Sequence, residues 1–341
     1  MSSLLVDVLR GARSSRRPVW IMRQAGRYLP EYRELRADRS FEQLSGDPAL
    51  AAEVTLQPMR RFDLDAAIVF ADLVSPVSAL GLNMRFDPGP VLDTPLRTRA
   101  DILALPRPDP AEAAPEVHET LRRVRAELPD DKALLGFGGA PLTLACYLVE
   151  GRGKSGFPTL RALLRSDPKT FSELLDRLTH LVSGYLIEQA RAGADAVQVF
   201  DSWAGLLSVE EWREHVRPAL HSMMTELERA GVPRILFLNG APHLVEEYAA
   251  LPAEALATCW RTDLGALRRR IGPDKVLQGN LDPATLLAGA ETTAAATRRL
   301  LDAVPAEGHV FNLGHGILPE TPIESVHALL EVVHGEQAGT S

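Results

Sequence analysis

The chain has 341 residues, of which 45% are hydrophobic and 24% are charged, and its formal net charge is −8. This composition is that of a globular protein, and the acidic balance argues against a nucleic-acid partner. The two cysteines, Cys146 and Cys259, are too few for a disulfide framework or a multi-cysteine metal site.

The hydrophobic pattern excludes two further classes of protein. No segment approaches the roughly 18 uncharged apolar residues that a membrane helix needs, so we expect no membrane partner. Residues 1–17 contain four arginines and lack the apolar core of a secretion signal. We therefore expect a cytoplasmic protein.

Short apolar runs alternate with helical patterns along the chain. Eight runs predict β-strands, at residues 18–22, 66–70, 133–137, 196–200, 234–238, 255–260, 275–278 and 309–313. Apolar residues at helical spacing, preceded by proline or a capping residue, predict helices at 114–128, from 141 onward and at 168–192.

This alternation predicts an α/β protein, a single (β/α)8 TIM barrel spanning residues 1–341. The roughly 43 residues between the first two strands are helical in pattern and predict an extra N-terminal helical segment beside the barrel. We expect the polar tail from about residue 335 to be frayed. Active sites of such barrels follow the strand ends, where this chain carries polar and glycine-rich clusters.

Arg23 and Arg27 follow the first predicted strand. If the turn is helical, their i, i+4 spacing places both guanidinium groups on one face. Residues 10–39 contain nine arginines against three acidic residues, and a guanidinium pairs with a carboxylate through two hydrogen bonds. This favours a small anionic ligand, and the alternatives are salt bridges to Glu31 and Glu34 or a solvated arginine face.

Asp72 and Tyr147 follow the second and third predicted strands. Asp72 either caps a helix or, with arginines near it, binds ligand N–H groups or stabilises a developing cation. Tyr147 lies about two turns into the helix that begins at Pro141. It either points into the cavity or belongs to the core.

Ser202 and His315 follow the fourth and eighth strands. No Gly-x-Ser-x-Gly motif surrounds Ser202, so a hydrogen bond to a ligand fits better than a nucleophile. His315 lies between Gly314 and Gly316, which would let a ligand approach closely. Without His-x-x-x-His, His-Glu-x-x-His or His-x-Cys, we expect no zinc site.

These motifs closely resemble those of the uroporphyrinogen decarboxylase family of tetrapyrrole synthesis. Residues 18–32 (PVWIMRQAGRYLPEY) and 136–151 (GFGGAPLTLACYLVEG) look like the family's two signatures. Shorter similar stretches extend the match from about residue 4 to 334, at 56–70, 200–205, 277–283 and 311–316.

The resemblance implies a cofactor-free decarboxylase that forms a homodimer and converts the four acetates of uroporphyrinogen III to methyls, giving coproporphyrinogen III. It implies that Arg23 and Arg27 bind substrate carboxylates and that Asp72 meets the pyrrole N–H groups. The family's cleft tyrosine, serine and histidine fall on Tyr147, Ser202 and His315. Asp72, Arg23 and Tyr147 are alternative proton donors.

Three positions depart from the family's usual pattern. Leu142 stands where an aromatic residue is usual, Asn239 where lysine is common and Cys259 where aspartate is common. Two other functions stay open. A corrinoid-linked methyltransferase of the same barrel family would carry zinc on a His-x-Cys pair and a later cysteine, and a non-catalytic porphyrinogen-binding protein would bind the macrocycle without turnover.

Overall fold

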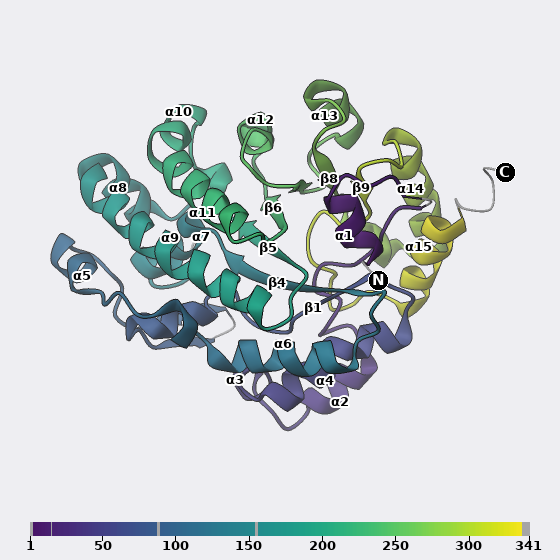
Figure 1. Ribbon diagram of the computed structural model, residues 1–341, viewed down its shortest axis with the longest axis horizontal. Helices are drawn as coiled ribbons and strands as arrows, with labels where there is room; N and C mark the ends of the chain where they lie inside the picture. Colours follow the sequence, from purple (N-terminus) through teal and green to yellow (C-terminus); the bar gives the residue numbers. More distant parts are fainter. Residues whose placement is uncertain (1–2, 15, 87–88, 154–155, 336–341) are drawn as a thin grey trace.

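The computed structural model describes residues 3–14, 16–86, 89–153 and 156–335 (Figure 1). The tail expected to fray lies almost wholly outside these ranges. The main sheet contains seven parallel strands in the order β1-β4-β5-β6-β7-β8-β9. They are β1 (Ala66–Ile68), β4 (Ala133–Gly139), β5 (Ala196–Asp201), β6 (Arg234–Leu238), β7 (Ala255–Thr258), β8 (Val276–Gln278) and β9 (His309–Val310).

The predicted first strand, residues 18–22, closes this sheet into a ring between β9 and β1. Val19 forms a parallel bridge with Phe311, and the Phe311 N–H donates to the Pro18 carbonyl at 2.8 Å. On the other side, the Asp65 N–H donates to the Val19 carbonyl at 2.8 Å. The (β/α)8 barrel is therefore confirmed, with seven regular strands and one irregular segment among the described residues.

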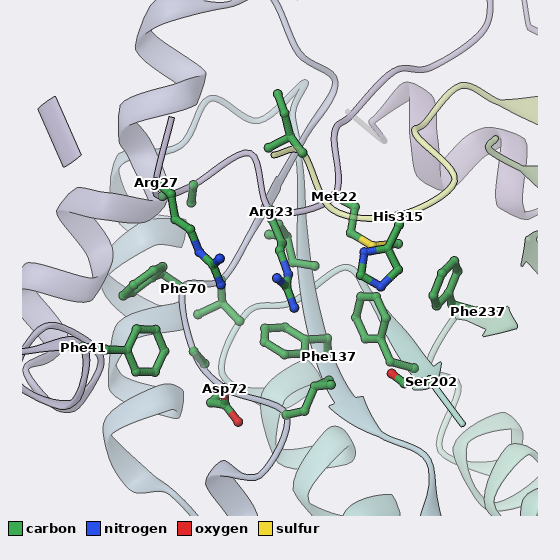
Figure 2. Close-up of a pocket in the computed structure, with 18 of the residues that line it drawn as sticks. Met22, Arg23, Arg27, Phe41, Phe70, Asp72, Phe137, Ser202, Phe237 and His315 are labelled. Carbon is green, nitrogen blue, oxygen red and sulfur yellow. The ribbon is translucent and has the colours of Figure 1, made fainter. Parts of the chain in front are cut away.

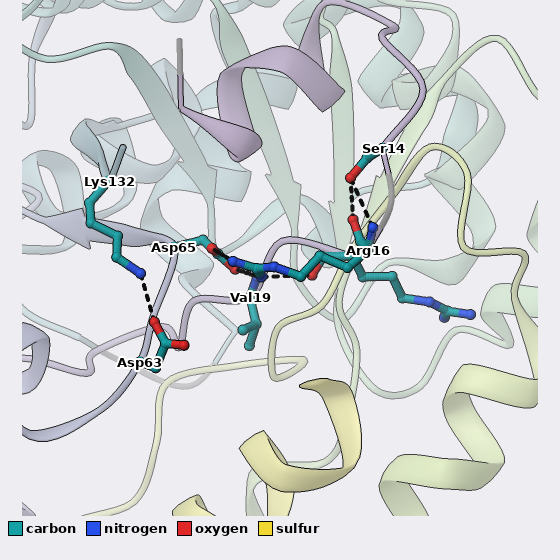
Figure 3. A network of polar contacts seen from close by, with 7 residues as sticks. Ser14, Arg16, Val19, Asp63, Asp65 and Lys132 are labelled. Carbon is teal, nitrogen blue, oxygen red and sulfur yellow. Dashed lines mark hydrogen bonds and ion pairs between the residues drawn. The ribbon is translucent and has the colours of Figure 1, made fainter. Parts of the chain in front are cut away.

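Side chains explain why this segment is not a regular strand. The Asp65 carboxylate accepts a hydrogen bond from the Val19 N–H at 2.8 Å, and Figure 3 shows Arg16 pairing with the same carboxylate. The Met22 N–H donates to Asn312 Oδ1 at 2.9 Å. Because side chains bind these N–H groups, no continuous backbone ladder forms along the segment.

Most helices lie around the outside of the strands in Figure 1. The predicted helices are confirmed within one or two residues as α6 (Pro115–Glu127), α7 (Pro141–Glu150) and α9 (Pro168–Arg191). The extra helical segment is confirmed as α2 (Pro30–Arg36), α3 (Phe41–Gly46) and α4 (Pro48–Arg61). The others are α1 (Leu4–Leu9), α5 (Arg99–Ala104), α8 (Pro158–Ser166), α10 (Val209–Glu211), α11 (Arg217–Arg229), α12 (Val245–Ala249), α13 (Leu264–Ile271), α14 (Ala290–Ala303) and α15 (Ile323–Gly335).

The glycines of the second signature allow β4 to approach α9 closely. A Cβ at Gly136 would lie 2.2 Å from Gln189 Oε1. The buried Gln189 amide clamps Phe137 by accepting from its N–H at 2.8 Å and donating to its carbonyl at 2.9 Å. Because side chains alternate along a strand, Gly136 faces the helix while Phe137 faces the barrel interior.

A short antiparallel hairpin outside the barrel was not predicted. It pairs β2 (Met84–Phe86) with β3 (Pro90–Leu92). The Phe86 ring packs 5.2 Å from that of Phe41 at the start of α3. Its three-residue strands are too short to give a clear alternating pattern in the sequence.

Within the described ranges, no helix is long and apolar enough to cross a membrane.

Candidate active site

A cavity opens at the rim formed by the carboxyl ends of the strands (Figure 2). The loops that follow residues 18–22 and β1 form part of its wall. The strands β4 to β6, the helix α7 and the loop after β9 form further parts of it. Six of the lining residues are those that the sequence predicts: Arg23, Arg27, Asp72, Tyr147, Ser202 and His315.

The loop that carries Arg23 is a tight turn rather than a helix, so the helical spacing considered for Arg23 and Arg27 does not apply. The Gln24 N–H donates to the Ile21 carbonyl at 2.8 Å, and Arg23 has a φ of +63°. Arg23 is the third of the four residues in this turn, and with a positive φ that position is usually occupied by glycine. The buried Gln24 amide holds the turn by accepting from the Ile21 N–H and donating to the Ala66 carbonyl, both at 2.9 Å.

Arg23 and Arg27 both direct their guanidinium groups into the cavity (Figure 2). Glu31 pairs with Arg61 at 2.7 Å instead, and in the part of the chain that the structure describes neither cavity arginine forms an ion pair. Partial removal from water and the neighbouring charge of Arg27 lower the pKa of Arg23, and Asp72 partly offsets this. Two cations that no described carboxylate neutralises favour an anion in the cavity.

Asp72 both shapes its own turn and lines the cavity. Its Oδ1 accepts a hydrogen bond from the Val74 N–H at 3.0 Å. Burial raises the pKa of Asp72 to about 6, although the Val74 N–H and the charge of Arg23 act in the opposite direction. The carboxyl is therefore mostly ionised at neutral pH and poorly solvated.

His315 is a neutral group at physiological pH. Burial and the positive charges of Arg23 and Arg261 lower its pKa to about 4. Its ring packs 6.2 Å from Phe237 and 6.3 Å from Trp260, measured between centroids. His315 can therefore exchange hydrogen bonds with a ligand without adding charge.

The glycines that flank His315 make room for protein rather than for ligand, which corrects the expectation from the sequence. A Cβ at Gly314 would lie 2.3 Å from the backbone nitrogen of Trp260. A Cβ at Gly316 would lie 2.4 Å from Cδ of Arg23. The loop after β9 is thus packed between Trp260 and the Arg23 side chain.

Ser202 is held by Thr143, near the start of α7, and Tyr147 packs on Trp203, the residue after Ser202. The Ser202 N–H donates to Thr143 Oγ1 at 2.9 Å, and Thr143 Oγ1 donates to Asp201 Oδ1 at 3.0 Å. Tyr147 is half-buried against Trp203, with ring centroids 6.4 Å apart. Burial, together with the charge of Asp72, raises the pKa of Tyr147.

An apolar wall of the cavity is not predicted from the sequence. Phe137, Phe200 and Phe237 line it, with Phe200 edge-on to each of the others at centroid distances of 5.7 and 5.5 Å. Their common signal is a phenylalanine at or next to the end of a predicted strand. This signal is weak because a buried phenylalanine in a strand is more often part of the core.

The three departures lie at or near this rim. Leu142 is fully buried in the first turn of α7. The Asn239 amide donates to the Ser202 carbonyl at 3.3 Å, and Cys259 Sγ accepts from the Gly240 N–H at 3.3 Å. No cluster of three His, Cys, Asp or Glu side chains that could hold a metal ion is found among the described residues.

By its fold the molecule is a (β/α)8-barrel protein, and by its cavity one suited to an anionic ligand with an apolar body. The chain belongs to the uroporphyrinogen decarboxylase family, whose model, described as Uroporphyrinogen decarboxylase (URO-D), matches residues 2–336. This confirms the resemblance seen in the sequence.

Named relatives agree with this placement, and a solved structure agrees with the fold. A Geobacter metallireducens protein named uroporphyrinogen decarboxylase is 42% identical over 335 residues, covering 98% of both chains. A Nocardia farcinica protein of that name is 46% identical over 332 residues, covering 95% of this chain and 93% of the relative. A methyltransferase structure from Methanosarcina mazei has a TM-score of 0.81 over 97% of both chains, and at 19% identity it shows the fold alone.

Proposed function

We propose that this protein is an enzyme that decarboxylates uroporphyrinogen III, converting its four acetate side chains to methyl groups to give coproporphyrinogen III. The observation that carries the proposal is the charge arrangement of the cavity. Arg23 and Arg27 lie on one wall with no carboxylate partner among the described residues, and the poorly solvated Asp72 lies across from them (Figure 2). The substrate has the matching form, with peripheral carboxylates around an apolar ring system that carries N–H groups.

The reaction needs an electron sink because direct loss of CO2 from an acetate would leave a carbanion. Protonation of the ring carbon next to the acetate-bearing carbon makes a cationic iminium. The electron pair of the breaking C–CO2 bond flows into this iminium, CO2 leaves, and an exocyclic methylene remains. Protonation of the methylene and loss of the added ring proton restore the pyrrole, so each round consumes one proton.

The cavity residues supply charge and position for these steps. Asp72 accepts hydrogen bonds from the pyrrole N–H groups and stabilises the positive charge of the protonated ring. This electrostatic stabilisation is strong where water is excluded. Arg23 and Arg27 hold carboxylates of the substrate and orient the reacting acetate. Tyr147, Ser202 and the neutral His315 contact the substrate through hydrogen bonds.

The proton donor is one of Asp72, Arg23 and Tyr147. The environment lowers the pKa of Arg23 and raises that of Tyr147. The lowered pKa makes Arg23 a stronger acid than an ordinary guanidinium, and the raised pKa makes Tyr147 a weaker acid than an ordinary phenol.

An anaerobic turnover assay with uroporphyrinogen III, with products separated by carboxylate number, tests the function. Stepwise conversion from eight carboxylates to four supports the proposal. Binding without conversion would support a non-catalytic porphyrinogen-binding protein. Neither binding nor conversion, with zinc found in the pure protein, would support the methyltransferase alternative.

We further propose that the enzyme works in the cytoplasm as a homodimer without a cofactor. The family resemblance supports each of these points. Sedimentation analysis tests the dimer, because a monomer at assay concentration contradicts it. Activity should survive dialysis against a chelator, and a loss restored by added metal would contradict the cofactor-free mechanism.

A further inference from the structure

A third arginine lies beside the cavity, next to His315. Arg261 follows Trp260 in the loop after β7, and its guanidinium carbon lies 4.3 Å from the centroid of the Trp260 ring. The Trp260 ring in turn meets the His315 ring at 90°. Gly314, which precedes His315, packs on Trp260, and Gly316, which follows it, packs on Arg23. His315 therefore lies between Arg23 and the Trp260–Arg261 pair.

The loop that carries Arg261 is fixed. The Thr262 N–H donates to the Cys259 carbonyl at 3.1 Å and closes a turn around Trp260 and Arg261. The buried Asn280 amide donates to the carbonyls of Cys259 and Thr262, at 2.9 and 2.8 Å. The backbone of Arg261 is therefore tied to the barrel, and stacking on Trp260 restricts its long side chain.

The charge of Arg261 is not neutralised by a carboxylate among the described residues. The side chain is exposed, and in the described ranges no carboxylate forms an ion pair with it, whereas Arg270 on the following helix pairs with Glu246 at 2.6 Å. Its charge acts at the cavity, since it contributes to the lowered pKa of His315.

The proposed substrate carries more carboxylates than Arg23 and Arg27 can pair. Its eight carboxylates surround the whole ring, so those on the side away from Arg23 and Arg27 must meet either water or other cations. We propose that Arg261 binds one of these peripheral carboxylates, beyond His315 from Arg23. This inference rests on the proposed function.

Replacing Arg261 tests the inference, with Arg269→Gln as the matched control. Arg269 is exposed on α13, and it too forms no ion pair within the described ranges, so the two variants change the net charge equally. For Arg261→Gln we expect KM for uroporphyrinogen III to rise about fivefold to tenfold, as for loss of one charged hydrogen-bond contact. The kcat should change less than twofold, and Arg269→Gln should match the wild type.

The dependence of KM on ionic strength distinguishes a substrate-binding role of Arg261 from a structural role. Loss of one substrate-binding cation should make KM of Arg261→Gln rise less steeply with ionic strength than KM of the wild type. Arg261→Lys keeps the charge but loses the planar fork, so its KM should lie between those of the wild type and Arg261→Gln.

Two results would overturn the inference. One is a KM for Arg261→Gln equal to that of Arg269→Gln. The other is a fall in kcat at unchanged KM, which would mean that Arg261 acts only by positioning His315. The wild-type assay comes first and separates the two proposals, because a wild type without turnover would contradict the function before any variant is compared.

Discussion

Arg23, in the wall of the cavity, has a backbone conformation that glycine usually adopts in turns. Its φ of +63° is uncommon for a residue with a side chain. Such local strain persists only where surrounding contacts enforce it, and here the buried Gln24 amide does so. The strained turn therefore serves to aim one guanidinium group.

Replacing Asp72 separates its contribution to activity from its effect on stability. Asp72→Asn keeps an oxygen that can accept the hydrogen bond from the Val74 N–H, but it removes the negative charge. We therefore expect kcat to fall at least about 100-fold. The unfolded chain releases this proton near pH 3.8, and the folded protein keeps it until about pH 6. Stability therefore falls as pH rises through that window, by about 3 kcal/mol at most.

Urea denaturation at pH 4 and at pH 8 checks this prediction. Asp72→Asn should be more stable than the wild type at pH 8, and the difference should nearly vanish at pH 4. A variant that is equally or less stable at pH 8 would show that Asp72 is not held in a poorly solvated site.

The guanidinium fork of Arg27 should matter beyond its charge. Arg27→Lys keeps the cation but cannot make two parallel hydrogen bonds to one carboxylate. We expect kcat/KM for uroporphyrinogen III to fall about tenfold, the effect of losing one charged hydrogen bond. Arg10→Lys, at an exposed position away from the cavity, is the control. Equal kcat/KM in both variants would contradict the role of Arg27.

At the scale of elements, the loop after β9 works as a spacer between two active-site walls. Gly316→Ala would press a methyl group against the flexible Arg23 side chain, 2.4 Å from its Cδ. The side chain can move aside, so stability should change by less than about 1 kcal/mol. Its guanidinium would be displaced, and we expect kcat/KM to fall at least about tenfold.

Steady-state kinetics and thermal unfolding check the Gly316→Ala prediction together. Gly46→Ala is the control, because a Cβ there meets no atom within 4 Å. Unchanged kinetics in Gly316→Ala would mean that the position of Arg23 does not limit turnover.

The sequence predicted elements where one local pattern decides the structure. Buried strands and capped helices such as α9 have such patterns, and the predicted site residues line the cavity because they follow strand ends or, for Tyr147, lie in the helix after one. The turn at Arg23 could not be predicted, since its positive φ depends on the Gln24 amide bonding to Ala66, which is distant in sequence. The roles of Gly314 and Gly316 depend likewise on Trp260 and Arg23, which only the fold brings near.

At the scale of the whole molecule, the barrel places the site but does not define the reaction. The Methanosarcina mazei methyltransferase has the same fold at 19% identity. Function in such barrels depends on the rim side chains. In this chain the two cavity arginines and Asp72 carry the argument for decarboxylation.

At the end of the barrel opposite the cavity, we expect the buried contacts that close the barrel to stabilise the fold more than a nearby surface ion pair does. Asp65 is buried and binds both Arg16 and the Val19 N–H (Figure 3). Asp65→Ala leaves these donors unpaired, and we expect a loss of about 3 kcal/mol or more in the free energy of unfolding. Asp63→Ala is the control: its pair with Lys132 is exposed on the Asp63 side, so its loss should cost less than about 1 kcal/mol. Similar losses in both variants would contradict this account of closure.

The Arg23 turn is held by residues near the other end of the chain, which sets when it can form during synthesis. Met22 donates its N–H to Asn312 and accepts at its carbonyl from the Ile317 N–H, both at 2.9 Å. A nascent chain in which residue 312 is not yet made already contains the arginines and Asp72 but lacks these backbone partners. A chain that stops before residue 312 also lacks Phe311 or ends at it, and Phe311 closes the barrel against residues 18 and 19, so we expect such a chain to have neither a closed barrel nor a working site.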